Sequence, residues 1–117
     1  MRVFLVEPHE GIRRRLKGLL SEIPGLEVIG EARGVPQALE GIRHSAPELV
    51  VSNLELSQGT GLDIVTGLRG MNPPPRVILV MDFGDGSVAQ ACVRAGADFC
   101  LYRHTRFEEL CQLVQSL

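Results

Sequence analysis

The sequence predicts an α/β fold in which a mostly parallel sheet is covered by helices on both faces. Two observations lead to this prediction. Short apolar runs alternate five times with segments in which apolar residues recur every three or four positions. Three of the short runs are continuously apolar, which is typical of strands buried on both faces. A chain of 117 residues is expected to form one domain, residues 1–117.

The predicted strands are short and rich in β-branched residues. In order along the chain they cover residues 3–6, 26–29, 49–51, 77–80 and, more weakly, 99–101. Helical spacing fills the segments that follow each strand: residues 12–23, 35–42, 62–68, 88–95 and 107–114. The order is therefore strand then helix, five times.

Proline and glycine mark the ends of these elements. Pro24-Gly25 follows the first helix, Pro47 precedes the third strand, and Gly96 is expected to cap the fourth helix. Strands that alternate with helices form parallel sheets through right-handed crossovers. The prediction is a flavodoxin-like doubly wound (βα)5 fold, whose five parallel strands have the order 2-1-3-4-5.

Composition narrows the possible partners and location. With 12 Lys and Arg against 14 Asp and Glu, the net charge of −2 does not favour a nucleic acid or an anionic membrane as a general partner. No apolar stretch approaches the roughly 20 residues that span a bilayer. The three cysteines lie within the predicted strands and helices. The N-terminus does not resemble a signal peptide, because the basic residues Arg13–Arg15 follow the first apolar run and do not precede it. We expect a cytoplasmic protein with reduced, core-filling thiols.

The functional crevice of such a fold lies at the carboxyl ends of the strands. The residues just after the predicted strands are Glu7, Pro8, Asn53, Met81, Asp82 and Arg103. Asn53 is the most informative of them, because the apolar run 49–51 leads to an amide where a reactive carboxylate would be expected.

These positions resemble the receiver domain of bacterial response regulators over essentially the whole chain. The similar segments are residues 47–56 (PELVVSNLEL) with Gly61, and residues 95–98 (AGAD). Met81 lies fifteen residues before Gly96 and Arg103 seven after it, the spacing at which the family places its Ser/Thr and its Lys. Because several spacings agree at once, the resemblance is specific.

The resemblance implies phosphoryl transfer to an Asp at position 53. Family members hold Mg²⁺ with that Asp and two acidic residues after the first strand, while Ser/Thr and Lys bind the phosphoryl oxygens. This chain differs at every one of those positions: Glu7 and Pro8 replace the acid pair, Asn53 the acceptor, Met81 the hydroxyl and Arg103 the lysine. An amide cannot form a stable acyl phosphate, so we interpret the chain as an atypical receiver, a pseudo-receiver.

The family's signal relay is altered as well, since Cys100 stands where an aromatic residue usually moves on phosphorylation. We expect Met81 and Pro8 to fill part of the former phosphate pocket, and Glu7 and Arg103 to pair across it. No cofactor is expected. The weak metal candidates are Glu7, Asn53, Glu55 and Asp82.

Protein partners in a signalling pathway are expected, and no direct nucleic acid binding, because the sequence shows no helix-turn-helix. The resemblance implies a dimer or output face on the last two helices and the last strand, with Arg94, Asp98, Arg103, Arg106, Glu108 and Glu109. Arg13, Arg14, Arg15 and Lys17 on the first helix are either a basic docking patch or, as we favour, a solvated helix face.

Three alternatives stay open. Asn53 could be an engineered substitution that silences an active receiver. The fold also hosts flavin and nucleotide sites, although residues 6–11 hold a single glycine and two carboxylates, which disfavours a phosphate-binding loop. The third alternative is phosphorylation at Ser52 or Ser57. It is disfavoured because neither hydroxyl has a recognisable activating base beside it in the sequence.

Overall fold

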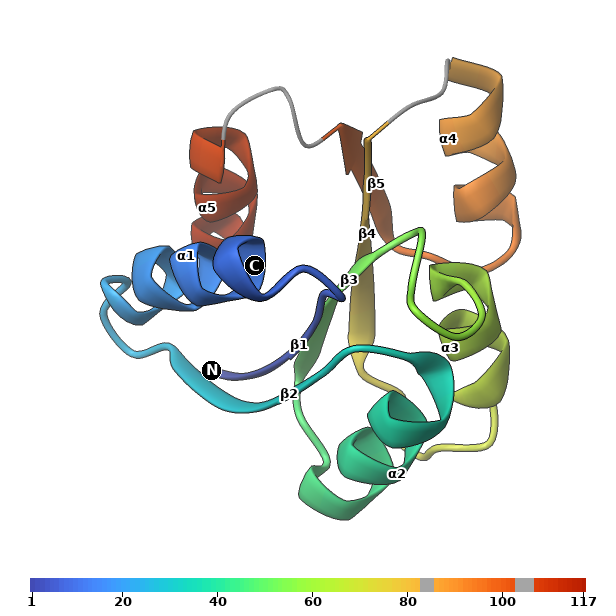
Figure 1. Ribbon diagram of the computed structural model, residues 1–117, viewed down its shortest axis with the longest axis horizontal. Coiled ribbons are helices and arrows are strands. Elements are labelled where there is room, and N and C mark those ends of the chain that lie inside the picture. Colours follow the sequence, from blue (N-terminus) through green and yellow to red (C-terminus); the bar gives the residue numbers. More distant parts are fainter. Residues whose placement is uncertain (83–85, 103–106) are drawn as a thin grey trace.

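The computed structural model describes residues 1–82, 86–102 and 107–117. In these residues strands and helices alternate along the chain (Figure 1). The elements are β1 (Arg2–Val6), α1 (Glu10–Ser21), β2 (Glu27–Ala32), α2 (Val35–Ser45), β3 (Leu49–Asn53), α3 (Gly61–Gly67), β4 (Arg76–Met81), α4 (Gly86–Arg94), β5 (Phe99–Tyr102) and α5 (Phe107–Ser116). All paired strands are parallel and their order is β2-β1-β3-β4-β5, which confirms the predicted fold.

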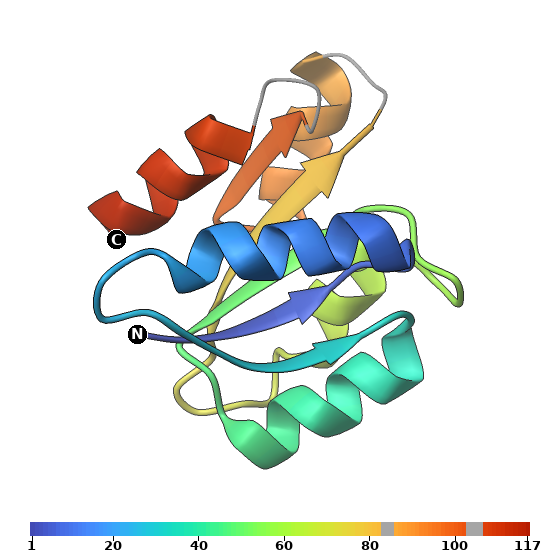
Figure 2. The same ribbon diagram turned by 60° about the vertical axis from the view of Figure 1, so that its left-hand side comes forward.

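The sheet lies between two layers of helices. Helices α1 and α5 cover one face, and α2, α3 and α4 cover the other (Figures 1 and 2). Each face has its own apolar core: Leu20 and Val114 belong to the first, Ile42 and Ile64 to the second. All five residues of β3 are buried, as expected for a central strand covered on both sides.

The helix ends follow local chemistry. Helix α1 ends at Ser21, two residues before the predicted end, because the amides of Glu22 and Ile23 bond to carbonyls three residues back and tighten the chain before Pro24. Helix α3 begins with a capping box between Thr60 and Asp63. After α4, Gly96 has a φ of +120°, a conformation that favours glycine, so its predicted role at this helix end is confirmed.

Strand register brings the carboxyl ends of the central strands together. Val6 of β1 pairs with Ser52 of β3, and Asn53 pairs with Val80 of β4. The loop after β1, the end of β3 and the end of β4 therefore meet at one edge of the sheet. None of the helices in the described ranges is long and apolar enough to cross a membrane.

Candidate functional site

A buried carboxylate and a buried amide form the centre of this edge. Glu7 is 2% exposed and Asn53 is 7% exposed. The Asn53 Nδ2 group donates to both carboxylate oxygens of Glu7, at 3.3 Å each. The Asn53 Oδ1 accepts from the backbone N–H of Glu55 at 3.3 Å, and Glu7 Oε2 also accepts from the His9 N–H at 3.2 Å. Both ends of the amide are thus used inside the protein.

The partner that we expected for Glu7, Arg103, lies outside the described residues. The contact between Glu7 and Asn53 was not foreseen, because the sequence interpretation treated Asn53 only as a lost acceptor. The sequence contains the information needed to predict this contact, because the residues after β1 and β3 of a parallel sheet face the same crevice. An amide in that crevice can donate a hydrogen bond to a neighbouring carboxylate.

A cavity of about 340 Å³ opens beside this pair. Its described lining residues come mainly from the loops after β1 and β3: Glu7, Pro8, His9, Ile12, Asn53, Glu55, Leu56, Ser57 and Asp82. Pro8 contributes to the wall, as expected. The expectation that Met81 fills part of the pocket is wrong, because Met81 is 1% exposed and packs in the apolar core beneath α3 and α4 with Cys92 and Ala97.

Strand alternation explains where Met81 goes. Successive side chains of a strand point to opposite faces, so Val77, Leu79 and Met81 share the core on the α3 and α4 side. Ile78 and Val80 lie in the other core. The thioether therefore continues the apolar row of β4 and does not enter the cavity.

The cavity does not fit the Mg²⁺ site that the family resemblance implies. Glu7, Glu55 and Asp82 line it, but no group of three His, Cys, Asp or Glu residues in the described parts of the chain could hold a metal ion. Pro8 offers no side-chain ligand, and Asn53 presents its NH₂ to Glu7 and its oxygen to a backbone N–H. A hard cation needs several oxygen ligands that converge on one point.

The relay position lies close to the same core. Cys100 of β5 packs against the apolar cluster that contains Met81 and Cys92. Burial is the main reason why the pKa of Cys100 is raised to about 12, and repulsion from an ionised Cys92 and a hydrogen bond between the two side chains add to it. Cys100 is therefore a protonated thiol at neutral pH, and it fills part of the core.

One of the four basic residues of helix α1 is buried. Arg13 is 8% exposed, whereas Arg14, Arg15 and Lys17 are exposed. Arg13 Nη1 donates to the Glu7 carbonyl at 2.9 Å, and Nε lies 3.3 Å from Glu31 Oε1. The expectation of a solvated face is wrong for Arg13. Its position three residues before Leu16 and seven before Leu20, on the buried stripe of α1, was the available signal.

The face formed by α4, β5 and α5 carries exposed apolar side chains. Val93 is 48% exposed and Phe99 is 36% exposed. Asp98, predicted to pair across a dimer, binds within the chain, because its Oδ2 accepts from the Val77 N–H at 2.7 Å. Arg94, Glu108 and Glu109 are exposed, and Arg106 lies outside the described residues.

The doubly wound sheet has its crevice at the ends of β1, β3 and β4, an arrangement that receiver domains share with other flavodoxin-like folds. The family model described as response regulator receiver domain matches residues 3–115. The chain therefore belongs to the response regulator receiver domain family.

Relatives and solved structures agree with this assignment. The DNA-binding transcriptional activator DevR/DosR of Mycobacterium tuberculosis is 28% identical over 117 residues, which cover all of this chain and 54% of that protein. A protein-glutamate methylesterase/protein-glutamine glutaminase of Myxococcus xanthus is 34% identical over 98 residues, 83% of this chain and 28% of that protein. The chain thus spans about half, or less, of the length of these curated relatives.

Similar folds occur in solved receiver domains. The receiver domain of the putative response regulator NarL from Mycobacterium tuberculosis has a TM-score of 0.90 at 23% identity, covering 98% of this chain and 93% of that chain. A LuxR-family response regulator from an Aurantimonas species has a TM-score of 0.91 at 24% identity, covering 98% of this chain and 82% of that one. At these identities the likeness concerns the fold.

Proposed function

We propose that this chain is a receiver domain that is not phosphorylated at position 53 and acts through phosphorylation-independent contacts with other proteins. It has no enzymatic activity of its own in this proposal, and it works in the cytoplasm. In this proposal the family's phosphorylation positions are degenerate, because they hold Glu7, Pro8, Asn53, Met81 and Arg103, and Cys100 stands at the relay position.

The contact between Asn53 and Glu7 is the observation that supports this proposal most. An active site would present an anionic oxygen at residue 53 as the nucleophile. Here the side chain that ends β3 is an amide, and its NH₂ group donates to both oxygens of Glu7. Separating this buried pair would remove both of these hydrogen bonds from the Asn53 NH₂ group, at a cost of about 1–3 kcal/mol. The pair therefore favours a single, fixed arrangement of the pocket.

The alternatives have less support. Ser52 is fully buried and its Oγ donates to the Asn53 carbonyl, so a kinase would have to unfold the strand to reach it. In the loop after β1, the N–H groups of Glu7 and His9 donate to the Ala32 carbonyl and to Glu7 Oε2. Those N–H groups are not directed at a bound phosphate, which disfavours a nucleotide or flavin site.

Phosphorylation chemistry gives the direct test. Incubation with acetyl phosphate and Mg²⁺, followed by intact mass measurement, should leave the mass unchanged, while a receiver with the family's aspartate gains one phosphoryl group in parallel. A phosphorylated product of the wild-type chain would overturn the proposal. The Asn53→Asp variant should also remain unlabelled, because Pro8 and Met81 still replace the ligand and the hydroxyl. Ready labelling of that variant would instead support an active receiver silenced at one position.

A second copy of the chain is one candidate partner. The exposed Val93 and Phe99 lie on the α4 and β5 surface, which also holds Arg94 and Asp98. Large exposed apolar side chains beside charges are common at interfaces. In a homodimer of this kind, Phe99→Glu shifts the sedimentation coefficient to that of a monomer. Monomeric wild-type protein at high concentration would contradict this candidate.

A further inference from the structure

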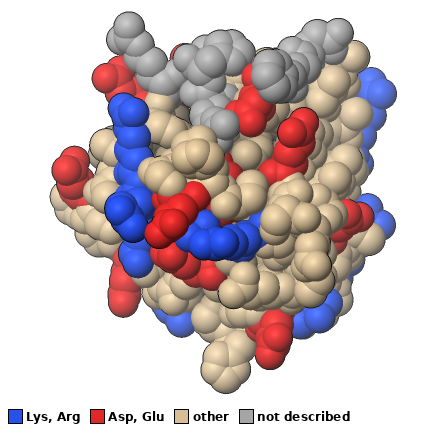
Figure 3. Space-filling model, in the orientation of Figure 1, with Lys and Arg blue, Asp and Glu red and all other residues tan. Residues whose placement is uncertain are grey.

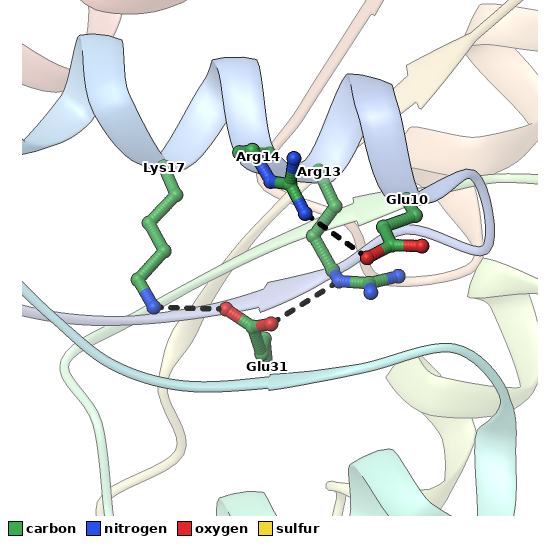
Figure 4. A pocket seen from close by; sticks show the side chains of 5 residues that line it. All are labelled: Glu10, Arg13, Arg14, Lys17 and Glu31. Carbon is green, nitrogen blue, oxygen red and sulfur yellow. Dashed lines mark hydrogen bonds and ion pairs between the residues drawn. The ribbon is translucent and has the colours of Figure 1, made fainter.

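A charged groove runs between α1 and the end of β2, apart from the cavity beside Asn53. It consists of two hollows of about 130 and 160 Å³, which share Arg13 and Glu31. The remaining charged lining residues are Glu10, Arg14, Lys17 and Arg33. Figure 4 shows Lys17 and Arg13 reaching Glu31 from two successive turns of α1, with Arg14 directed to Glu10.

The charge of this region is opposite to that of the rest of the chain. Helix α1 contains four basic residues and one acid, a net charge of +3. Since the whole chain has a net charge of −2, all other residues together carry −5. On the face that Figure 3 shows, which has the orientation of Figure 1, blue and red atoms lie side by side in the region of α1.

Two kinds of ion pair line the groove. Arg14 and Glu10 are 3.1 Å apart with side chains 80% and 62% exposed, and Lys17 lies 3.2 Å from Glu31 with side chains 52% and 38% exposed. Exposed pairs of this kind contribute about 0–1 kcal/mol and exchange partners readily. Arg13 differs, because its buried guanidinium is held by Glu31 and by the Glu7 carbonyl. The groove thus has a fixed basic floor and a rim of cations that other carboxylates can bind.

We propose that this groove binds an acidic polypeptide segment of a partner protein. The inference rests on the proposed function, since it names the surface and the partner chemistry for contacts that do not depend on phosphorylation. Carboxylates of the segment bind Arg14, Lys17 and Arg33 in place of the intramolecular acids, so charge complementarity favours association.

Nucleic acid and a second copy fit the groove less well. Phosphates follow one another regularly along a nucleic acid, and Glu10 and Glu31 between the cations would repel them. A peptide can place carboxylates beside the cations and neutral or basic groups beside those acids. In a second copy of this chain, the described acids lie on different elements, among them Glu40 of α2, Asp63 of α3 and Glu109 of α5.

The floor of the groove is joined to the former phosphorylation loop. Arg13 Nη1 binds the Glu7 carbonyl at 2.9 Å, and the Glu7 N–H donates to the Ala32 carbonyl at 3.0 Å, next to Glu31. A segment that attracts Arg13 or replaces Glu31 therefore changes the surroundings of the Glu7 amide. This gives the inference a second readout besides affinity.

Fluorescence anisotropy with a labelled peptide of alternating glutamate and glycine tests the inference on the intact chain. We expect binding at low ionic strength that weakens as salt is added, and none to the matching glutamine peptide. The double variant Arg14→Glu/Lys17→Glu should weaken binding about tenfold or more. Its control, Arg43→Glu/Arg76→Glu, changes the net charge equally at exposed positions on α2 and β4 and should bind within about twofold of wild type.

Amide chemical shifts locate the contact. Addition of the glutamate peptide should move the signals of Arg14, Lys17, Glu31 and Glu7. Equal loss of affinity in both double variants, shifts confined to other surfaces, or no binding at low salt would each overturn the inference. If the charge-reversed groove variant is unstable, Arg14→Gln/Lys17→Gln replaces it. These results do not depend on labelling by acetyl phosphate, so failure here is distinguishable from failure of the proposed function.

Discussion

The pocket at the ends of β1 and β3 and the groove beside α1 both contain charged side chains, but they hold them differently. In the pocket, Glu7 is 2% exposed and hydrogen-bonded to a buried amide. In the groove, Arg14 and Lys17 are exposed and pair with acids on the surface. Buried polar pairs are costly to rearrange, whereas exposed ones exchange with little loss. In the function that we propose, the former reaction centre is structural and the neighbouring surface is available to partners.

The largest expected effect comes from restoring the acid in the pocket. Asn53→Asp places a second carboxylate against Glu7 and removes two N–H donors from a buried site. We expect the free energy of unfolding at pH 7 to fall by about 2–4 kcal/mol. Chemical denaturation measures this, with the exposed Gln90→Glu on α4 as the control that should stay within about 0.5 kcal/mol of wild type. Equal stability of Asn53→Asp and wild type would show that the amide is not a structural part of the pocket.

The Arg13→Ala variant tests whether the buried cation of the groove contributes more to stability than the exposed ones. Arg13→Ala removes a buried guanidinium from the Glu7 carbonyl and from Glu31, and it deletes apolar contacts of the side-chain stem. The expected loss in the free energy of unfolding is about 2 kcal/mol, smaller than for Asn53→Asp because Glu31 stays solvated. Arg14→Ala, in the next position and 80% exposed, is the matched control and should cost under about 0.5 kcal/mol. Similar losses for the two variants would remove the distinction between floor and rim.

The pH dependence of stability tests whether the cations of the groove stabilise the Glu31 carboxylate. Desolvation alone would raise the pKa of Glu31, but hydrogen bonds and positive charges from Lys17 and Arg13 outweigh it and lower that pKa below its usual 4.5. A lowered folded-state pKa means that the carboxylate stabilises the fold above the usual value and loses this contribution as the pH falls through the lowered one. Comparison of Glu31→Gln with wild type should show a stability difference at pH 6 that shrinks as the pH falls below 4.5. A difference that grows on acidification would contradict the assignment.

The smallest expected effect on stability is that of replacing Lys17, an exposed cation at the rim of the groove. Lys17→Ala breaks an exposed pair with Glu31 and should change the free energy of unfolding by no more than a few tenths of a kcal/mol. Thermal unfolding monitored by circular dichroism at two salt concentrations is sufficient to measure it. A loss comparable to that of Arg13→Ala would mean that the rim is structural and cannot exchange partners.

Much of the architecture could be predicted because it depends on local patterns. The period of apolar residues gave all five strands and five helices, and the glycine after α4 was correctly placed at a helix end. The pocket residues Glu7, Pro8 and Asn53 were also found, since parallel strands bring their carboxyl ends together. These features follow from sequence spacing alone.

The features that were predicted wrongly or missed depend on the direction in which single side chains point. Met81 follows the alternation of β4 into the core, although its sequence position suggested the cavity. Arg13 is charged and so was assigned to solvent, but two oxygen partners from separate elements allow its burial. The Asn53 contact joins residues 46 positions apart, so it follows from the parallel sheet that brings the ends of β1 and β3 together and not from a local pattern.

In the proposed function the pocket does not respond to a phosphoryl group, and beryllofluoride, which mimics that group, gives a test. Thermal unfolding of the wild-type chain should be followed with and without Mg²⁺ and beryllofluoride, beside a receiver that carries the family's aspartate. We expect an unchanged melting temperature for this chain and a rise for the comparison protein, because only a bound ligand stabilises the folded state. A rise of several degrees in this chain that requires both Mg²⁺ and beryllofluoride would contradict it.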